Sequence, residues 1–369
     1  MHLTIHEIEK IPIVFIIGRG RSGTSLLQTI FDAHPSVITA NESVFIIHLK
    51  QKYSRVKIWS EDKINEFIID LYKDLKFLHL WNVDQTILRN KINLYPINEI
   101  NFSILCKLVY LSVKSPFSKN KISLIVDKNP IYSFFINELI ALFPNAKFIH
   151  LVRDYRDNVI SSRKAFGIKN VAVLSQRWKR QNMYIDKLSS KHINNFYKVQ
   201  YETLVRNAEQ IVMEICIFSG ILYNPAMLDF YQTTNKIYNE NVPERKVLNA
   251  IVHKIHLNLL NPINTTQINK WKEELTNNEI ELIDYIAGNY GVKYNYHPTT
   301  NKFKFNYLYH FFKSYFISYL DLLVYKSYYK LPMTLRDFLF ALSKKVHTTF
   351  GYTNKYNKVA INYRDKKQS

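Results

Sequence analysis

The feature that most constrains the fold is an apolar run that ends in a glycine-rich loop. Residues 11–17 are followed by Gly18-Arg19-Gly20-Arg21-Ser22-Gly23-Thr24-Ser25, and apolar residues then recur at helical spacing up to residue 33. A continuous apolar run that ends at a glycine is typical of a strand buried in a parallel sheet. Strand, loop and helix in this order predict an α/β fold.

The rest of the chain supports this fold class. Further strands are predicted at 121–126, 147–152 and 196–200, with helices at 131–143 and 204–219. Strands that alternate with helices indicate a mainly parallel sheet flanked by helices. We expect a domain over 11–300, with a helical insertion at about 43–115, and a C-terminal extension over 301–369.

The glycine-rich loop has the chemistry of an anion site. Its backbone N–H groups and the start of the following helix favour a phosphate or sulfate group, Thr24 and Ser25 add hydroxyls, and Arg21 adds a positive charge. The spacing of Gly18 and Gly23 is that of a P-loop, but Thr24 stands where nucleoside triphosphatases have lysine. The loop therefore predicts an anion site without the usual nucleotide-hydrolysing lysine.

Charge also favours anionic partners. The chain has 50 Lys and Arg against 30 Asp and Glu, a net charge of +20, and residues 301–369 hold 13 of these cations, three Asp and 18 aromatic residues. We expect a basic, aromatic helical extension. Packed helices that cover the core would explain this composition, and contact with the acceptor or a membrane surface is the alternative. The chain shows no secretory signal and only two cysteines, so we expect a cytoplasmic protein rather than a disulfide scaffold.

Residues 15–35, FIIGRGRSGTSLLQTIFDAHP, resemble the 5′-phosphosulfate loop of sulfotransferases that use 3′-phosphoadenosine 5′-phosphosulfate (PAPS). The spacing of the motifs is most similar to that of the tyrosylprotein branch. The resemblance implies a P-loop NTPase-like sulfotransferase fold. It also implies that Arg21 contacts the sulfuryl group and that the 5′-phosphate is held by Ser22, Gly23, Thr24 and Ser25.

A second segment, residues 142–161, is similar to the part of this family that holds the 3′-phosphate. Arg153 ends an apolar strand and Ser161 follows eight residues later. An arginine suits bidentate phosphate binding, and this spacing can put both side chains on one phosphate. Taken alone, Arg153-Asp154 would be an ordinary surface ion pair; together with the first loop, it predicts a reader of the 3′-phosphate.

The resemblance also supplies a general base and further contacts. Glu42 lies 21 residues after Arg21, the spacing of the base in the tyrosylprotein branch; His34 is the competing candidate, but its His-Pro pair is a structural turn in the family. By the same match, Lys128 stabilises charge on the transferred group. Contacts to the nucleotide are implied for Tyr201, Asn264 and Lys270.

Three positions differ from the tyrosylprotein pattern, and one of them is at about Ile255, where the family has a serine in the late cofactor loop and this chain has His253 and His256 close by. Val44 replaces a substrate-binding arginine, and Ala165 replaces an arginine at the 3′-phosphate, although Arg163 and Lys164 are close. Transfer of tyrosine sulfation to this chain is therefore not implied. The two cysteines are too far apart for a CxxC pattern, and we expect no metal.

The expected activity is in-line transfer of a sulfuryl group from PAPS, as co-substrate, to a hydroxyl or amine. The acceptor class stays open among carbohydrate, small molecule, lipid and peptide. One alternative is a P-loop nucleotide kinase. The other is a non-enzymatic basic module that binds nucleic acid or a membrane surface, for which the net charge of +20 is the argument.

Overall fold

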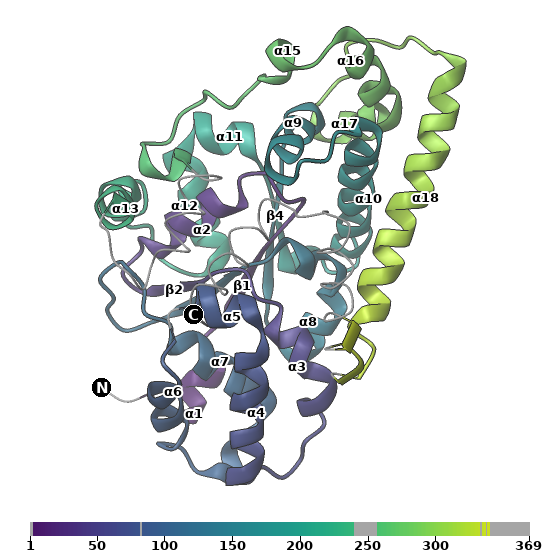
Figure 1. Ribbon diagram of the computed structural model, residues 1–369. Coiled ribbons are helices and arrows are strands. Elements are labelled where there is room, and N and C mark those ends of the chain that lie inside the picture. Colours follow the sequence, from purple (N-terminus) through teal and green to yellow (C-terminus); the bar gives the residue numbers. More distant parts are fainter. Residues whose placement is uncertain (1–2, 82, 240–256, 333, 337, 340–369) are drawn as a thin grey trace.

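A parallel sheet forms the centre of the molecule in the computed structural model, which describes all residues except 1–2, 82, 240–256, 333, 337 and 340–369 (Figure 1). The strands lie in the order β2-β3-β1-β4-β5, and every neighbouring pair is parallel. Their bounds are Ile13–Ile17 (β1), Val37–Ala40 (β2), Leu124–Lys128 (β3), Lys147–Val152 (β4) and Phe196–Gln200 (β5). The predicted fold class is confirmed.

The central strand β1 is buried on both faces. Ile13, Phe15 and Ile17 belong to one apolar core, and Val14 and Ile16 belong to another. Successive side chains of a strand point to opposite faces, so this apolar run needs helices on both sides. One face packs on α2 (Thr24–Asp32) and α12 (Ala208–Ser219), and the other packs on α7 (Phe102–Leu111) and α8 (Ile136–Leu142).

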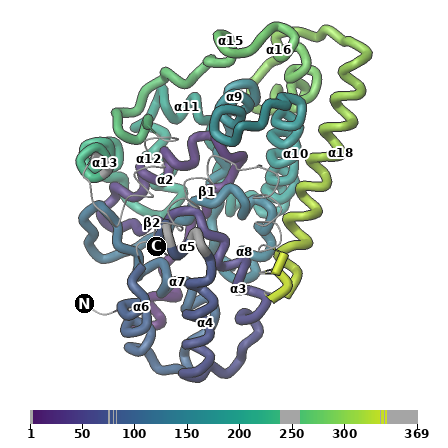
Figure 2. Tube along the Cα trace, in the orientation of Figure 1, coloured from purple at the N-terminus to yellow at the C-terminus, as the bar shows by residue number. Residues whose placement is uncertain are grey.

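A helical lobe separates β2 from β3 in the chain. It consists of α3 (Phe45–Tyr53), α4 (Glu61–Lys73), α5 (Leu75–Leu80), α6 (Gln85–Ile92) and α7. Figure 2 shows this lobe at the lower end of the molecule. Aromatic rings fill its centre: Phe45 packs on Phe77, Trp81 and Tyr110, with ring centroids 5.3–6.2 Å apart. The domain boundaries themselves stay a prediction.

Two predicted helices are each divided into two. The segment 131–143 forms a 3₁₀ turn, Pro130–Phe134, and then α8, because Phe135 between them has φ −127°. The segment 204–219 forms the end of α11 (Tyr201–Arg206) and then α12, with Asn207 at φ −125° between them. Both breaks leave the sheet unchanged.

The described part of the C-terminal extension is mainly one long helix, α18 (Phe305–Tyr328), which packs along α10 (Val171–Ser189). Arg177 pairs with Asp321 at 2.6 Å, and Arg180 donates a hydrogen bond to Ser318 and covers the Tyr315 ring. Residues 340–369 of the predicted extension lie outside the described residues. Among the residues that are described, no helix combines the length and apolar character needed to cross a bilayer.

Candidate active site

The loop of residues 18–25, called the phosphate loop below, makes a tight turn between β1 and α2. Gly18 has φ +140°, and a Cβ there would lie 2.3 Å from the Leu151 carbonyl oxygen of β4. Gly23 has φ +94°, and a Cβ there would lie 2.5 Å from Cδ2 of Tyr201. The two glycines therefore let the loop approach β4 and the start of α11 closely.

The first turn of α2 presents backbone N–H groups. Gly23 precedes α2 and supplies no side-chain cap. Ser22 and Thr24 are buried at the turn, with 0% and 4% of their surface exposed. An uncapped helix start that follows a glycine loop favours a bound anion through its N–H groups and its dipole.

Two side-chain amides hold the phosphate loop in place, and neither belongs to a motif of the sequence. Asn158, in α9 (Tyr155–Phe166), donates through Nδ2 to the Gly20 carbonyl oxygen at 3.0 Å and to the Ser22 hydroxyl at 3.1 Å. Gln181, in α10, donates to the Gly18 carbonyl oxygen at 2.8 Å and to the Ser133 hydroxyl at 3.1 Å. They lie 138 and 163 residues from their loop partners, so no local motif reveals them.

The two halves of the predicted phosphate site meet in space. Nε of Arg21 donates to the Ser161 hydroxyl at 3.1 Å, and Nη1 of Arg153 donates to the Arg21 carbonyl oxygen at 3.3 Å. The Arg153 guanidinium also lies 4.8 Å from the centre of the Tyr201 ring. Its Nε is buried and has no hydrogen-bond partner among the residues that the structure describes, which fits a site for an anionic group.

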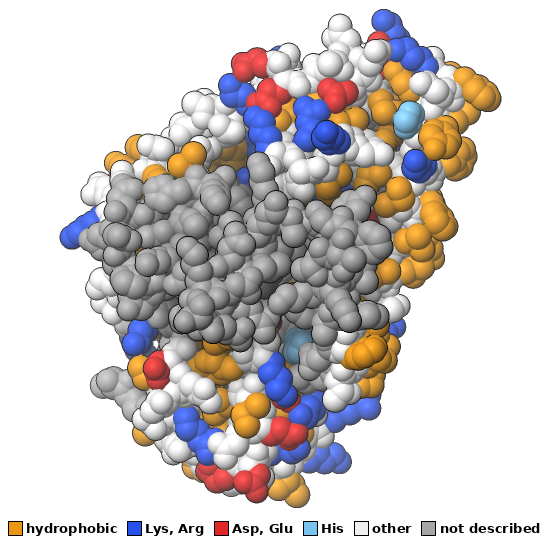
Figure 3. Space-filling view, in the orientation of Figure 1, with side chains coloured by type: hydrophobic (Ala, Val, Ile, Leu, Met, Phe, Trp, Pro, Cys, Tyr) orange, Lys and Arg blue, Asp and Glu red, His pale blue; other side chains and the backbone are white. Residues whose placement is uncertain are grey.

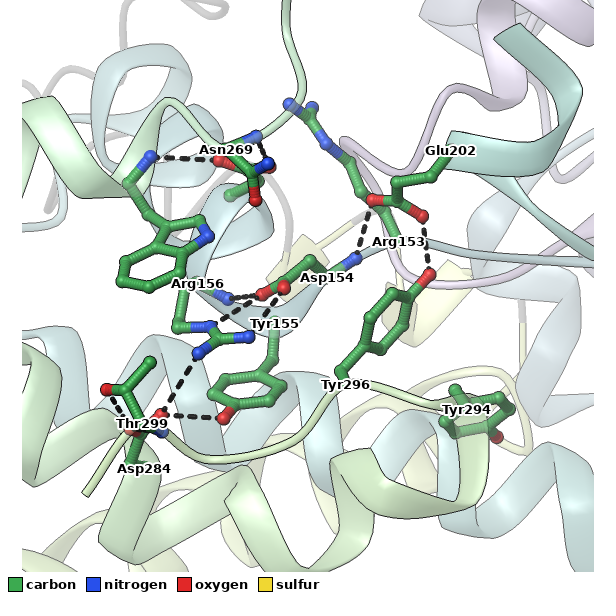
Figure 4. Close-up of polar contacts among 12 residues, drawn as sticks. Arg153, Asp154, Tyr155, Arg156, Glu202, Asn269, Asp284, Tyr294, Tyr296 and Thr299 are labelled. Atoms are coloured by element: carbon green, nitrogen blue, oxygen red, sulfur yellow. Dashed lines mark hydrogen bonds and ion pairs between the residues drawn. The ribbon is translucent and has the colours of Figure 1, made fainter. Parts of the chain in front are cut away.

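Asp154 does not neutralise Arg153. Its carboxylate binds the guanidinium of Arg156, with contacts of 3.0 and 2.8 Å, and its backbone N–H donates to Glu202 at 3.0 Å. Figure 4 shows this cluster, with the Arg153 side chain pointing away from it. Asp154 therefore pairs with Arg156, and not with Arg153 as the two neighbouring residues alone would suggest.

Glu42 and Lys128 form an ion pair at the ends of neighbouring strands. Lys128 Nζ lies 2.7 Å from Glu42 Oε1, and 6% of the lysine side chain and 27% of the glutamate side chain are exposed. Behind them, burial and the negative charge of Glu42 raise the pKa of the Asp127 carboxyl to about 8, although the Tyr110 hydroxyl donates to it.

These side chains share one edge of the sheet. The phosphate loop follows β1, Glu42 follows β2, Lys128 ends β3, Arg153 follows β4 and Tyr201 follows β5. The carboxyl ends of parallel strands lie together, and ligands of open α/β sheets bind there. His34 lies elsewhere: its two ring nitrogens contact the Leu222 carbonyl oxygen and the Ser36 N–H group, each at 3.0 Å, as expected for a structural turn.

Asn264 and Lys270 have only local contacts among the described residues. Asn264 accepts hydrogen bonds from Thr266, and Lys270 pairs with Glu273 at 2.9 Å. Their segment reaches the site through its backbone, since the Gln267 carbonyl oxygen accepts from Arg153 at 2.5 Å. Their contact with a nucleotide stays a prediction.

A third residue that the sequence does not reveal, Asp157, anchors this late segment. Its carboxylate accepts from the backbone N–H groups of Asn269 at 2.8 Å and Trp271 at 3.0 Å. Burial raises the pKa of this carboxyl to about 6, although the positive charge of Arg153 opposes the shift. Asp157 thus joins α9 to the segment that carries Lys270.

Two of the positions that differ from the family pattern lie in or at the start of described helices, and Ile255 lies outside the described residues. Val44 lies at the start of α3 and Ala165 in α9. The nearby cations point elsewhere: Arg163 pairs with Glu279 and Lys164 with Glu274, both at 2.7 Å. In the part of the chain with described coordinates, no group of three or more His, Cys, Asp or Glu side chains could hold a metal ion.

Comparison with known proteins gives matches to sulfotransferases. The model of the Sulfotransferase family matches residues 12–225. Protein-tyrosine sulfotransferase A of Caenorhabditis elegans is 26% identical over 75% of this chain and 65% of its own length. Protein-tyrosine sulfotransferase of Drosophila melanogaster is 24% identical over 75% of this chain and 50% of its own length. The chain thus spans one half to two thirds of these relatives. The sulfotransferase domain of the Synechococcus PCC 7002 olefin synthase aligns with a TM-score of 0.49 and 20% identity, over 75% of this chain and 94% of that one.

Proposed function

The chain belongs to the sulfotransferase family, and from this premise we propose that it transfers a sulfuryl group from PAPS to an acceptor hydroxyl or amine. The observation that carries the proposal is the shared sheet edge, which holds two arginines, an uncapped helix start and an ion-paired glutamate and lysine. The protein-tyrosine sulfotransferases among its relatives make a tyrosine-containing peptide the first acceptor to test.

The phosphate loop and the second segment would hold the nucleotide. The N–H groups at the start of α2, with Ser22, Thr24 and Ser25, suit the 5′-phosphate. Arg153, with its unpartnered buried Nε, and Ser161 suit the 3′-phosphate. The contact between Arg21 and Ser161 is one that a bound nucleotide would replace, which would free the guanidinium for the sulfuryl group.

Glu42 is the proposed general base. PAPS supplies an activated sulfuryl group; the acceptor oxygen or nitrogen bonds to sulfur while the bond from sulfur to the bridging phosphate oxygen breaks, and adenosine 3′,5′-bisphosphate leaves. The Glu42 carboxylate takes the acceptor proton, and Lys128 holds that carboxylate in place at 2.7 Å. Lys128 and Arg21 are placed to stabilise charge that develops on the transferred group.

The test is turnover of PAPS with a tyrosine-containing peptide. Glu42→Gln should lower turnover about 100-fold or more, because it removes the base but keeps the shape of the side chain. Glu279→Gln is the matched control, since Glu279 is also ion-paired at 2.7 Å and is 28% exposed, close to the 27% of Glu42. Near-normal turnover of Glu42→Gln would refute the role of Glu42, and absence of transfer to hydroxyl and amine acceptors of every class would refute the proposed activity.

A further inference from the structure

The outer side of α18 is apolar although it faces solvent. Phe305, Tyr309, Phe312 and Phe316 are 61–83% exposed, and Leu320 and Leu323 are each 42% exposed. Figure 3 shows hydrophobic side chains along the edge of the molecule where α18 lies. These six residues, called the α18 stripe below, are spaced four, three, four, four and three positions apart, so they share one side of the helix.

The opposite side of α18 packs on the rest of the protein. Tyr307, Ser314 and Ser318 are buried, and Phe311 packs on the Tyr285 ring at 6.2 Å. A helix that is apolar on both sides is normally buried on both. An exposed apolar strip of this length marks a surface that binds a membrane or another protein.

The charges around the α18 stripe favour an anionic partner. The stripe itself has no charged residue, and Asp321, the acidic residue within α18, is bonded to Arg177 of α10. Lys313, beside the stripe, donates a hydrogen bond to the Tyr309 hydroxyl at 3.3 Å, and Lys330 is exposed just past the helix end. In sequence, residues 340–369 add seven Lys and Arg against one Asp.

We propose that the α18 stripe docks on the surface of a membrane that contains anionic lipids. Aromatic side chains suit the boundary between headgroups and acyl chains, and the positive charges of Lys313 and Lys330 add electrostatic attraction to anionic lipids. A second copy of the chain fits less well, because antiparallel packing of two α18 stripes about a two-fold axis would bring the Lys313 side chains of both copies together. This proposal is independent of the proposed sulfuryl transfer.

The test is flotation of the full chain with vesicles. We expect binding to vesicles of two parts phosphatidylcholine to one part phosphatidylglycerol, weak binding to phosphatidylcholine alone, and release as salt rises from about 0.1 M to about 0.5 M. The double variant Phe312→Ser, Phe316→Ser should lower the affinity about tenfold or more. The matched control is Ile217→Ser, Leu222→Ser, which removes two apolar side chains that are 78% and 87% exposed outside α18.

A second variant tests the charge separately. Lys313→Glu with Lys330→Glu should weaken binding to the anionic vesicles, and unchanged circular dichroism and melting temperature would show that each variant is folded. Absence of binding to the anionic vesicles would overturn the proposal, as would binding that the phenylalanine variant leaves within twofold. A dimer, or a complex with a nucleic-acid oligonucleotide, that the phenylalanine variant disrupts while no vesicles are bound would assign the stripe to that partner instead.

Discussion

Arg153 and Asp154 are neighbours in the sequence but have separate partners. Asp154 binds Arg156, whose guanidinium stacks on Trp271 at 4.1 Å, and Arg153 turns toward the phosphate loop. The sequence shows an arginine beside an aspartate and cannot say which of two nearby arginines the carboxylate takes. The structure decides it because Asp154 caps α9 and therefore faces the first turn of that helix.

At the same scale, Asp127 predicts a dependence of stability on pH. Burial and the charge of Glu42 raise the pKa of its carboxyl to about 8 in the folded protein, from an ordinary value of 3.8. Between these values the folded chain keeps a proton that the unfolded chain has lost, so the free energy of unfolding falls as pH rises through this window.

Asp127→Asn should remove this fall, because an amide does not ionise. We take the free energy of unfolding of the variant minus that of the unmodified protein. This difference should grow by about 1 kcal/mol or more from about pH 5 to about pH 8. Urea unfolding at both pH values measures the gain. The exposed Asp62, changed to Asn, is the control; equal pH dependence in all three proteins would show that Asp127 does not titrate in this window.

At the scale of elements, the phosphate loop was predictable and its supports were not. The glycines and hydroxyls of the loop are contiguous in the sequence, and their order reveals the turn. Asn158, Gln181 and Asp157 support the site from α9 and α10, and each looks like an ordinary polar residue of a helix. The short β2, with four residues, was absent from the predicted strands because so short a run gives little periodicity.

Gly23 and Gly20 give a direct test of how the loop is packed. Gly23→Ala should lower the free energy of unfolding by about 1–3 kcal/mol, because its φ is +94° and the new Cβ would meet the Tyr201 ring. Gly20→Ala is the matched control, since a Cβ there has no heavy atom within 4 Å. Denaturant unfolding measures both, and equal stabilities would contradict the close packing of Tyr201 on the loop.

At the scale of the whole molecule, strand order is what brings distant motifs together. Because β1 lies between β3 and β4, the phosphate loop lies between Lys128 and Arg153. In the sequence these two residues are 25 positions apart, and both are more than 100 positions from the loop. Alternating strands and helices predicted the class of fold. They did not predict which side of α18 packs on the protein. Apolar residues occur on both sides of this helix, so tertiary contacts decide which side is buried.

The net charge of +20 belongs to this scale as well. Clustered cations raise the local concentration of an anionic substrate, and salt screens the effect. The proposed preference for a nucleotide with a 3′-phosphate depends instead on Arg153 and Ser161, which are fixed at the sheet edge. A short-range preference of this kind should persist at high salt, whereas general attraction by the net charge should not.

The most direct test of the sulfotransferase account is therefore calorimetric titration with adenosine 3′,5′-bisphosphate, the desulfated product, beside AMP and ATP. The account predicts tight binding that requires the 3′-phosphate, and a loss of about 10-fold to 100-fold in that preference in Arg153→Ala. Arg163→Ala is the control, because that arginine binds Glu279 instead. Preferred binding of ATP, or binding of none of the three nucleotides, would contradict the account.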